Sequence, residues 1–170
     1  MGVFAPHAKF RSFALTFWLY IAPSPVGTFP YFFCGAQAVP QSGQPAGNRA
    51  VVVEVDIYTA PTGIALHRGT AWNAARFDTM DLMVPAYRRV DVLHNRSATD
   101  TWIVKYRGAE VLRYSDPAVE RWREDSGPFL GFGARTGASA GTFAIRRVEL
   151  EATSEPAWAA RLAVQKLPDE

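Results

Sequence analysis

The chain has 170 residues, of which 48% are hydrophobic and 20% are charged. These values suit one folded domain and exclude a disordered chain, because about 150 residues already bury roughly two-thirds of their unfolded surface. The formal net charge is +2 and no run of Lys or Arg exceeds a pair, which argues against a phosphate-tracking nucleic-acid groove.

The single cysteine, Cys34, excludes an intramolecular disulfide and a zinc site built from several cysteines. The apolar run at residues 13–22 is too short to span a bilayer, which needs about 20 apolar residues. Residues 1–12 lack the order of charge, apolar core and cleavage site that marks a signal peptide. We therefore expect no membrane span. The sequence leaves the compartment open, although a single cysteine is compatible with the cytosol.

Strand patterns dominate the chain, since apolar and polar residues alternate with a period of two in most segments. Arg146 and Arg147 break the alternation of the last such segment, which predicts a β-bulge. The sequence YRGA at residues 106–109 predicts a tight turn. In chain order, the expected strands are residues 13–21, 29–39, 50–58, 63–68, 88–94, 101–106, 110–114, 129–136 and 142–151, and residues 81–84 fit one more short strand.

Only the tail has a helical pattern, because Ser154 suits a helix N-cap, with Glu155 and Pro156 in the first turn. The many short strands, joined by turns that contain Gly and Pro, predict an all-β, two-sheet antiparallel jelly-roll sandwich. We expect an N-terminal extension, the sandwich, and a short C-terminal helix or tail, at residues 1–9, 10–152 and 153–170 respectively.

The segment AVVVEVDIY, residues 50–58, combines a strand pattern with two carboxylates. A period of two places Glu54, Asp56 and Tyr58 on one face, and the alternating residues Val51, Val53, Val55 and Ile57 on the other. The valine face suits a core. The acidic face must be solvated or paired, since charged groups are rarely buried alone, and an open groove would satisfy this requirement.

Three segments together resemble the concanavalin A-like lectin/glucanase superfamily: VVVEVDIY, then YRRVDVLHNRSATDTWIVKYRGAEVLRY, then GPFLGFGARTGASAGTFAIRRVELEA. The resemblance covers about residues 10–152 as a pattern of order and spacing. It implies a jelly roll of two antiparallel sheets, one of them concave. In such proteins the ligand lies in the concave groove or on the loops at its rim.

The resemblance also tests for catalysis and for metal binding. Laminarinase-like hydrolases have the pattern E-x-D-x-x-E, but Thr59 stands at the last position and cannot protonate a leaving group. In legume-type lectins the acidic strand binds metal, and Glu54, Asp56 and His67 match three ligands. Residues 59–65 lack the Asn and Asp that would complete a calcium site of about six to eight oxygens. We therefore expect no hydrolysis and no cofactor, with calcium as the less favoured alternative.

Three further residues are candidates for sugar contact. Trp18 either stacks on a sugar ring or fills the core, and the core is the more common use of a strand aromatic. Trp72 and Asn73, in the irregular stretch GTAWNAARFD, suit an aromatic and polar contact at the rim of a groove.

The favoured function is a non-catalytic, lectin-like carbohydrate-binding module that uses the concave sheet face and the loops at its rim. We expect Glu54, Asp56, Tyr58 and Trp18 on that one face, and Trp72 and Asn73 at the rim. The first alternative is a structural or protein-interaction jelly-roll domain without sugar binding, and the second is an atypical glycoside-acting enzyme. An open groove with aromatic residues would favour carbohydrate as the partner. A plugged groove, with an exposed apolar patch near Trp158 and Leu162, would favour a protein.

Overall fold

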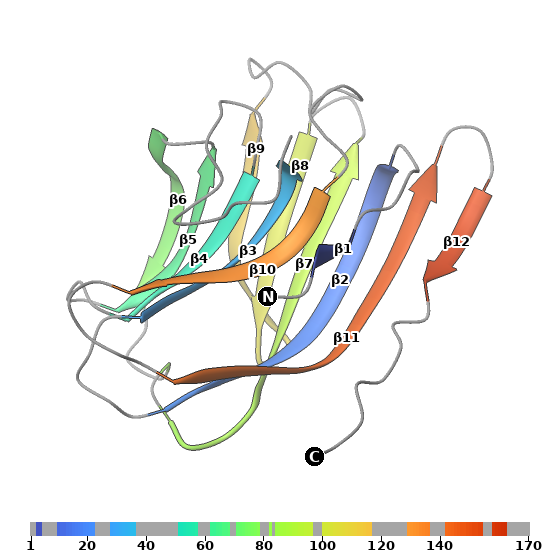
Figure 1. The fold of residues 1–170 in the computed structure, drawn as a ribbon. Coiled ribbons are helices and arrows are strands. Elements are labelled where there is room, and N and C mark those ends of the chain that lie inside the picture. The colour runs from blue at the N-terminus through green and yellow to red at the C-terminus, as the bar shows by residue number, and fades with distance from the viewer. Residues whose placement is uncertain are drawn as a thin grey trace. The chain divides into compact units, whose positions relative to one another are not determined.

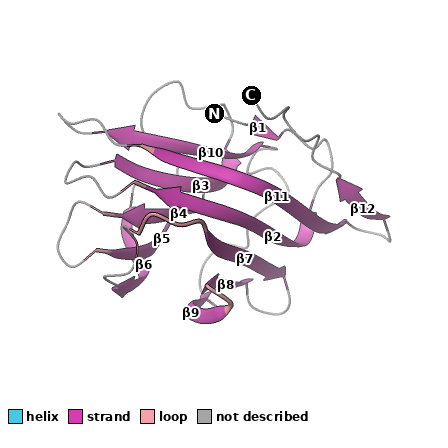
Figure 2. Ribbon diagram, turned by 90° about the horizontal axis from the view of Figure 1, so that it is seen from below, coloured by secondary structure: helices cyan, strands magenta, loops and turns pink. Residues whose placement is uncertain are grey.

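In the part of the chain that it describes, the computed structural model contains twelve strands and no helix. Accordingly, no helix long and apolar enough to cross a membrane occurs among these residues. Figures 1 and 2 show how the strands are arranged. The described residues are 3–4, 10–22, 28–36, 51–57, 62–68, 71–78, 82, 84–96, 100–116, 129–136, 142–154 and 158–162.

The first sheet, here called sheet A, has six strands, and all of its recorded pairings are antiparallel. Phe132, Phe32, Val53 and Leu66 are Cα partners in a row across four neighbouring strands, and all four side chains are buried. The rings of Phe32 and Phe132 lie 5.6 Å apart between centroids. The strand order is β1 (Val3–Phe4), β10 (Phe129–Thr136), β3 (Thr28–Ala36), β4 (Val51–Asp56), β5 (Gly63–Arg68) and β6 (Ala71–Asp78).

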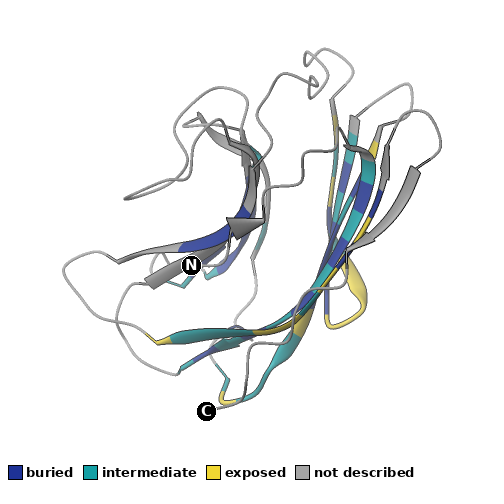
Figure 3. Ribbon diagram, turned by 45° about the vertical axis from the view of Figure 1, so that its right-hand side comes forward, coloured by how far each residue is buried: buried dark blue, intermediate teal, exposed yellow. Residues whose placement is uncertain are grey.

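The second sheet, sheet B, also has six strands. Along its central strand, residues 13–21, every second side chain is buried and the intervening ones are partly exposed, as the alternating colours of Figure 3 show. This alternation places one apolar stripe of the strand in the core and leaves the other face accessible. The strand order is β12 (Trp158–Leu162), β11 (Phe143–Ser154), β2 (Phe10–Ile21), β7 (Arg88–Arg96), β8 (Asp100–Tyr106) and β9 (Ala109–Asp116).

The two sheets form two compact units, but neither unit is a continuous piece of sequence. One unit contains Met1–Lys9, Ile21–Pro85 and Glu120–Phe143, and the other contains Phe10–Tyr20, Ala86–Val119 and Ala144–Glu170. The chain therefore passes repeatedly from one sheet to the other.

Local signals in the sequence are confirmed at the turn and at the bulge. Arg107 and Gly108 have φ angles of 56° and 84°, the left-handed pair that a tight two-residue hairpin turn requires. Arg147 has a φ of 48°, and it is exposed together with Arg146, so two adjacent residues of β11 leave the alternation.

The structure differs from the expectations in four segments. The predicted C-terminal helix is wrong at residues 158–162, which form β12 and pair with β11 from Ser154↔Trp158 to Leu150↔Leu162. The backbone groups along the edge of β11 offer the tail an alternative to helical hydrogen bonds. The predicted strand at 81–84 is wrong at Leu82 and Val84, and residues 71–78, which had no clear pattern, form β6.

At the other end of the chain, Val3 and Phe4 belong to sheet A, although we expected only an extension there. Most of that extension, and residues 163–170 of the tail, lie outside the described part.

Candidate functional site

The acidic strand is extended, as predicted, but its carboxylates are not open to solvent. Glu54 is 0% exposed and Asp56 is 3% exposed, while Val53 and Val55 on the opposite face are buried as well. Neither carboxylate lacks an interaction partner. Of the two states that the sequence allowed for these acids, solvated or paired, the structure shows the paired one. The expected open groove at this position is wrong, since no ligand can touch a side chain without exposed surface.

The residues beside Glu54 explain how sheet A accommodates a carboxylate. Its Cα partners are Tyr31 on β3 and Ala65 on β5, and Asp56 faces Gly63 across the same pair of strands. Ala65 and Gly63 are small and buried, so they leave volume for the acidic side chains. A carboxylate without exposure is destabilising unless neighbouring groups satisfy it, and so we interpret Glu54 and Asp56 as structural groups of sheet A.

The structure does not gather the other predicted site residues around these acids. Trp18 lies on β2 in sheet B, whereas Glu54 lies on β4 in sheet A, so the prediction that one sheet face carries both is wrong. Trp72 and Asn73 lie within β6 at the edge of sheet A, where we expected a loop, and their side chains are outside the described part. Tyr58 is also outside it.

Metal ligands do not cluster in the described residues. No group of three or more His, Cys, Asp or Glu among them is placed to hold a metal ion. The side chain of His67 is outside the described part, as is Thr59 of the hydrolase-like pattern. The expectation of no cofactor, with calcium as the less favoured alternative, therefore stays a prediction.

Trp18 occupies the partly exposed face of sheet B. Its neighbours Phe17 and Leu19 are buried, and Trp18 itself is half-buried together with Thr16 and Tyr20 on the same face. The prediction that favoured the core for this indole is therefore wrong. The alternation of β2 uses odd-numbered residues for packing and leaves the even-numbered residues available for contact.

Two arginines from the two strands beside β2 flank the indole of Trp18. Arg89 on β7 is its Cα partner, and the guanidinium carbon of Arg89 lies 5.8 Å from the ring centroid. Arg147 on β11 lies closer, with a distance of 4.9 Å. Both distances allow a cation–π attraction, and a guanidinium above the face of a tryptophan ring is a favourable pair of this kind. These contacts help to hold the three side chains in place.

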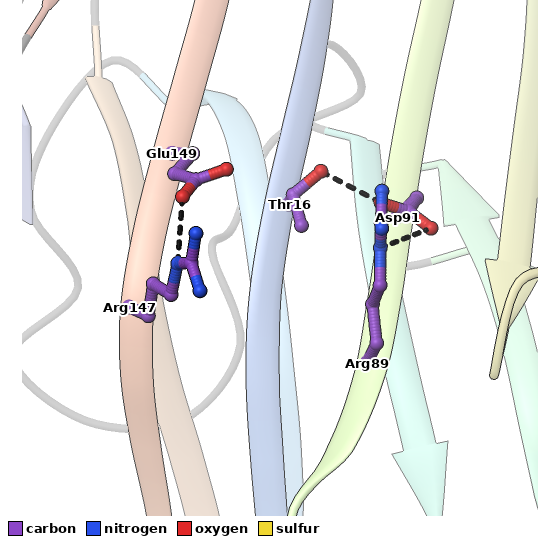
Figure 4. Close-up of polar contacts among 5 residues, drawn as sticks. All are labelled: Thr16, Arg89, Asp91, Arg147 and Glu149. Carbon is purple, nitrogen blue, oxygen red and sulfur yellow. Dashed lines mark hydrogen bonds and ion pairs between the residues drawn. The ribbon is translucent and has the colours of Figure 1, made fainter.

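Carboxylates fix both guanidinium groups (Figure 4). Nε of Arg89 donates to Oδ1 and Oδ2 of Asp91 at 2.9 and 3.1 Å, and the hydroxyl of Thr16 donates to the same Oδ1 at 2.6 Å. Nε of Arg147 donates to Oε1 of Glu149 at 2.8 Å. The hydrogen bond and charge of Asp91 raise the pKa of Arg89 further above its ordinary value, so this group stays cationic.

A second aromatic pair continues this face toward the end of β2. The rings of Tyr20 and Tyr87 lie 5.5 Å apart, and the guanidinium of Arg146 lies 4.4 Å from the ring centroid of Tyr87. We call this whole set the Trp18 surface, with its members Thr16, Trp18, Tyr20, Tyr87, Arg89, Asp91, Arg146, Arg147 and Glu149. It combines aromatic rings with fixed hydrogen-bond donors and acceptors.

Reasoning from the sequence found Trp18 but missed the arginines around it. The signal was present, because the only adjacent basic pairs of the chain, Arg88–Arg89 and Arg146–Arg147, both supply this surface. Each pair lies far from Trp18 along the chain, and their meeting depends on strand order.

Known structures with a similar fold include several carbohydrate-recognition domains. The Emp46p carbohydrate recognition domain, in its potassium-bound form, matches with a TM-score of 0.66 at 10% identity, over 85% of this chain and 74% of that chain. The VIP36 exoplasmic/lumenal domain, in its Ca²⁺- and mannose-bound form, matches with a TM-score of 0.63 at 10% identity, over 95% and 72% of the respective chains.

The chain has the concanavalin A-like fold. Sheep galectin-11 in complex with glycerol also matches, with a TM-score of 0.52 at 7% identity, over 88% of this chain and 96% of that chain. No protein-family model matches the sequence, and no curated protein matches it at the level of sequence. At identities this low, the structural similarity establishes the fold alone. The ligand has to be argued from the chemistry of the site.

The concanavalin A-like jelly roll predicted from three sequence segments is thus confirmed. The first segment forms β4, the second forms β7, β8 and β9, and the third forms β10 and β11. Two of these strands, β7 and β11, contribute residues to the Trp18 surface. The third contributing strand, β2, precedes all three segments in the sequence.

Proposed function

We propose that this protein binds carbohydrate without catalysing its breakdown, and that the Trp18 surface is the binding site. One observation carries this proposal: the half-buried indole of Trp18 is flanked by the guanidinium groups of Arg89 and Arg147 at 5.8 and 4.9 Å. An accessible aromatic ring among fixed polar groups on a sheet face is suited to a ligand that has both apolar and polar edges.

Sugar rings have this mixed character, since C–H groups cover their faces and hydroxyl groups surround their rims. Trp18, Tyr20 and Tyr87 offer aromatic surface to the C–H groups. The guanidinium and carboxylate groups of Arg147 and Glu149 offer donors and acceptors to hydroxyls. Because the ion pairs already order these side chains, binding loses less conformational entropy than it would with free ones.

The structural neighbours support carbohydrate as the class of ligand. Emp46p and Emp47p are represented by carbohydrate recognition domains, and VIP36 by a domain with mannose bound. One fold hosts many functions, so this likeness supports the proposal only together with the chemistry of the Trp18 surface.

A second candidate, protein binding, is favoured by a different feature of the same face. Ala14, Leu93 and Ile103 are Cα partners in one row across β2, β7 and β8, and all three are half-buried apolar residues. This row is small for a protein interface, which typically buries about 800 Å² on each partner. The side chains of Trp158 and Leu162, where we expected an apolar patch, are outside the described part.

A glycan array probed with the full chain, with and without calcium, tests the proposal. We expect glycan binding that is independent of calcium, strongly reduced in Trp18→Ala and unchanged in Leu93→Ala/Ile103→Ala. If the double variant loses glycan binding and Trp18→Ala retains it, the Trp18 surface is not the site. Melting temperatures of all variants control for misfolding.

A further inference from the structure

We infer that the glycan bound at the Trp18 surface is anionic, with carboxylate or sulfate groups on its sugar rings. This inference rests on the proposed function and names the chemical class of its ligand. It follows from which groups of the surface are exposed and from which hydrogen-bond donors remain for a ligand.

The exposed groups of the Trp18 surface are mainly cationic. The side chains of Arg147 and Arg89 are 69% and 52% exposed, whereas that of Asp91 is 9% exposed. Arg146 is exposed as well and has no carboxylate partner among the described residues. The carboxylate of Asp91 therefore fixes Arg89 from its buried side. The accessible layer consists of three guanidinium groups and one carboxylate, that of Glu149, whose side chain is 52% exposed.

The donors that remain on these arginines suit a two-oxygen anion. A guanidinium group has five N–H donors. Within the described part of the chain, Arg147 donates only through Nε, to Glu149, and Arg89 uses Nε and Nη2 for Asp91. No described residue accepts a hydrogen bond from either Nη atom of Arg147, so both can donate to a ligand. Two parallel N–H groups bind a carboxylate or a sulfate bidentately, and a sugar hydroxyl cannot match this geometry.

Contact with aromatic rings prepares the arginines for this role. A guanidinium that stacks on Trp18 has its plane against the ring, so its N–H edge stays free to hydrogen-bond. The bulged backbone at Arg147, with its φ of 48°, presents Arg146 and Arg147 together from a single strand. Arg146 contacts the ring of Tyr87, and Arg147 contacts the ring of Trp18.

The same surface is poorly suited to nucleic acid. A nucleic-acid backbone has closely spaced phosphates and needs a continuous cationic track. Here Asp91 and Glu149 alternate with the arginines, and the net charge of the whole chain is only +2. An acidic glycan, with one charge on each sugar or on every second sugar, fits isolated guanidinium groups better.

Matched ligands that differ only in charge test the inference. Isothermal titration of the full chain would compare oligogalacturonate with its methyl ester, and dextran sulfate with dextran, at low and high salt. We expect the charged member of at least one pair to bind about tenfold or more tightly, as expected for charge-assisted hydrogen bonds, with weaker binding at high salt. The carboxylate pair and the sulfate pair distinguish the two sources of negative charge.

Arginine variants assign the effect to the Trp18 surface. Arg147→Gln should lower affinity for the charged ligand about tenfold more than it lowers affinity for the neutral member of the same pair. Arg147→Lys, which keeps the charge but loses bidentate geometry, should restore only part of the affinity. The matched control is Arg113→Gln on β9, since Arg113 is also 54% exposed and also pairs through Nε with a glutamate, at 2.7 Å. That variant should bind like the parent chain.

Three other outcomes would contradict either the anionic ligand or the proposed function. Equal affinity for charged and neutral members of both pairs, or an equal loss in Arg147→Gln and Arg113→Gln, overturns the anionic ligand while glycan binding stands. Failure of every glycan, charged or neutral, overturns the proposed function and the inference with it. A single-stranded oligothymidylate that binds as tightly as the acidic glycans overturns glycan recognition in favour of nucleic acid.

Discussion

The guanidinium of Arg147 lies 4.9 Å from the ring centroid of Trp18, although the two residues are far apart in the sequence. The contact exists because β11 and β2 are neighbours in sheet B. It makes a half-buried strand tryptophan the centre of a polar and aromatic surface.

Trp18→Ala should weaken glycan binding more than it weakens the fold. The indole is half-buried, so its removal should lower the free energy of unfolding by about 1 kcal/mol, within the usual range for single substitutions. Affinity for the best array ligand should fall at least about tenfold, because the ring that orders both arginines is gone. Urea unfolding and titration calorimetry measure the two effects separately.

Asp91→Asn should be more destabilising than Glu149→Gln. Asp91 is buried and accepts hydrogen bonds from Arg89 and Thr16, and hydrogen bonds to charged groups are worth about 1.5–3 kcal/mol. Glu149 is 52% exposed, and exposed ion pairs contribute about 0–1 kcal/mol. Chemical denaturation of the two variants should show a clear difference, and equal midpoints would contradict this ranking.

Glu54→Gln should affect stability and leave ligand binding intact. Glu54 is 0% exposed and does not lack a partner, so replacing one of its carboxyl oxygens should lower the free energy of unfolding by about 1–3 kcal/mol. Glycan affinity of the folded variant should equal that of the parent chain. A folded Glu54→Gln protein that no longer binds glycan would return the site to the acidic strand.

Arg113→Gln should raise the pKa of Glu110. The hydrogen bond from Arg113 holds this pKa below its ordinary value of 4.5, with a smaller contribution from the charge of the same residue. Since the folded-state pKa is the lower one, the pair stabilises the fold above pH 4.5, and this stabilisation is lost as the pH falls through the folded-state pKa. An NMR titration of Glu110 in both proteins measures the change, and identical titration curves would contradict it.

Gly108→Ala should destabilise the hairpin between β8 and β9. Gly108 has a φ of 84°, and an added Cβ would meet no atom within 4 Å, so the cost is conformational and not steric. A left-handed backbone costs a non-glycine residue about 1–2 kcal/mol. Thermal unfolding should show a lower melting temperature. An unchanged melting temperature would contradict this expectation.

Much of the fold could be predicted from the sequence because its signals are local. Period-two alternation located β2, β4, β5, β7, β8, β9, β10 and β11. The doubled arginines marked the bulge, and Arg107–Gly108 marked the turn, since each depends only on adjacent backbone angles. The prediction of a helix in the tail was wrong because it used only a local pattern. Pairing with β11, which no local signal in the tail itself indicates, decided the conformation of residues 158–162.

The sequence by itself determined which residues of each strand share a face, including Trp18 with Thr16 and Glu54 with Asp56, because side-chain direction along a strand has a fixed period. It did not determine whether a face is covered or which strands adjoin. Burial of Glu54 and the meeting of Trp18 with Arg147 are decided by contacts between distant segments. Such contacts arise from sheet order, and a pattern confined to one strand contains no information about the strand beside it.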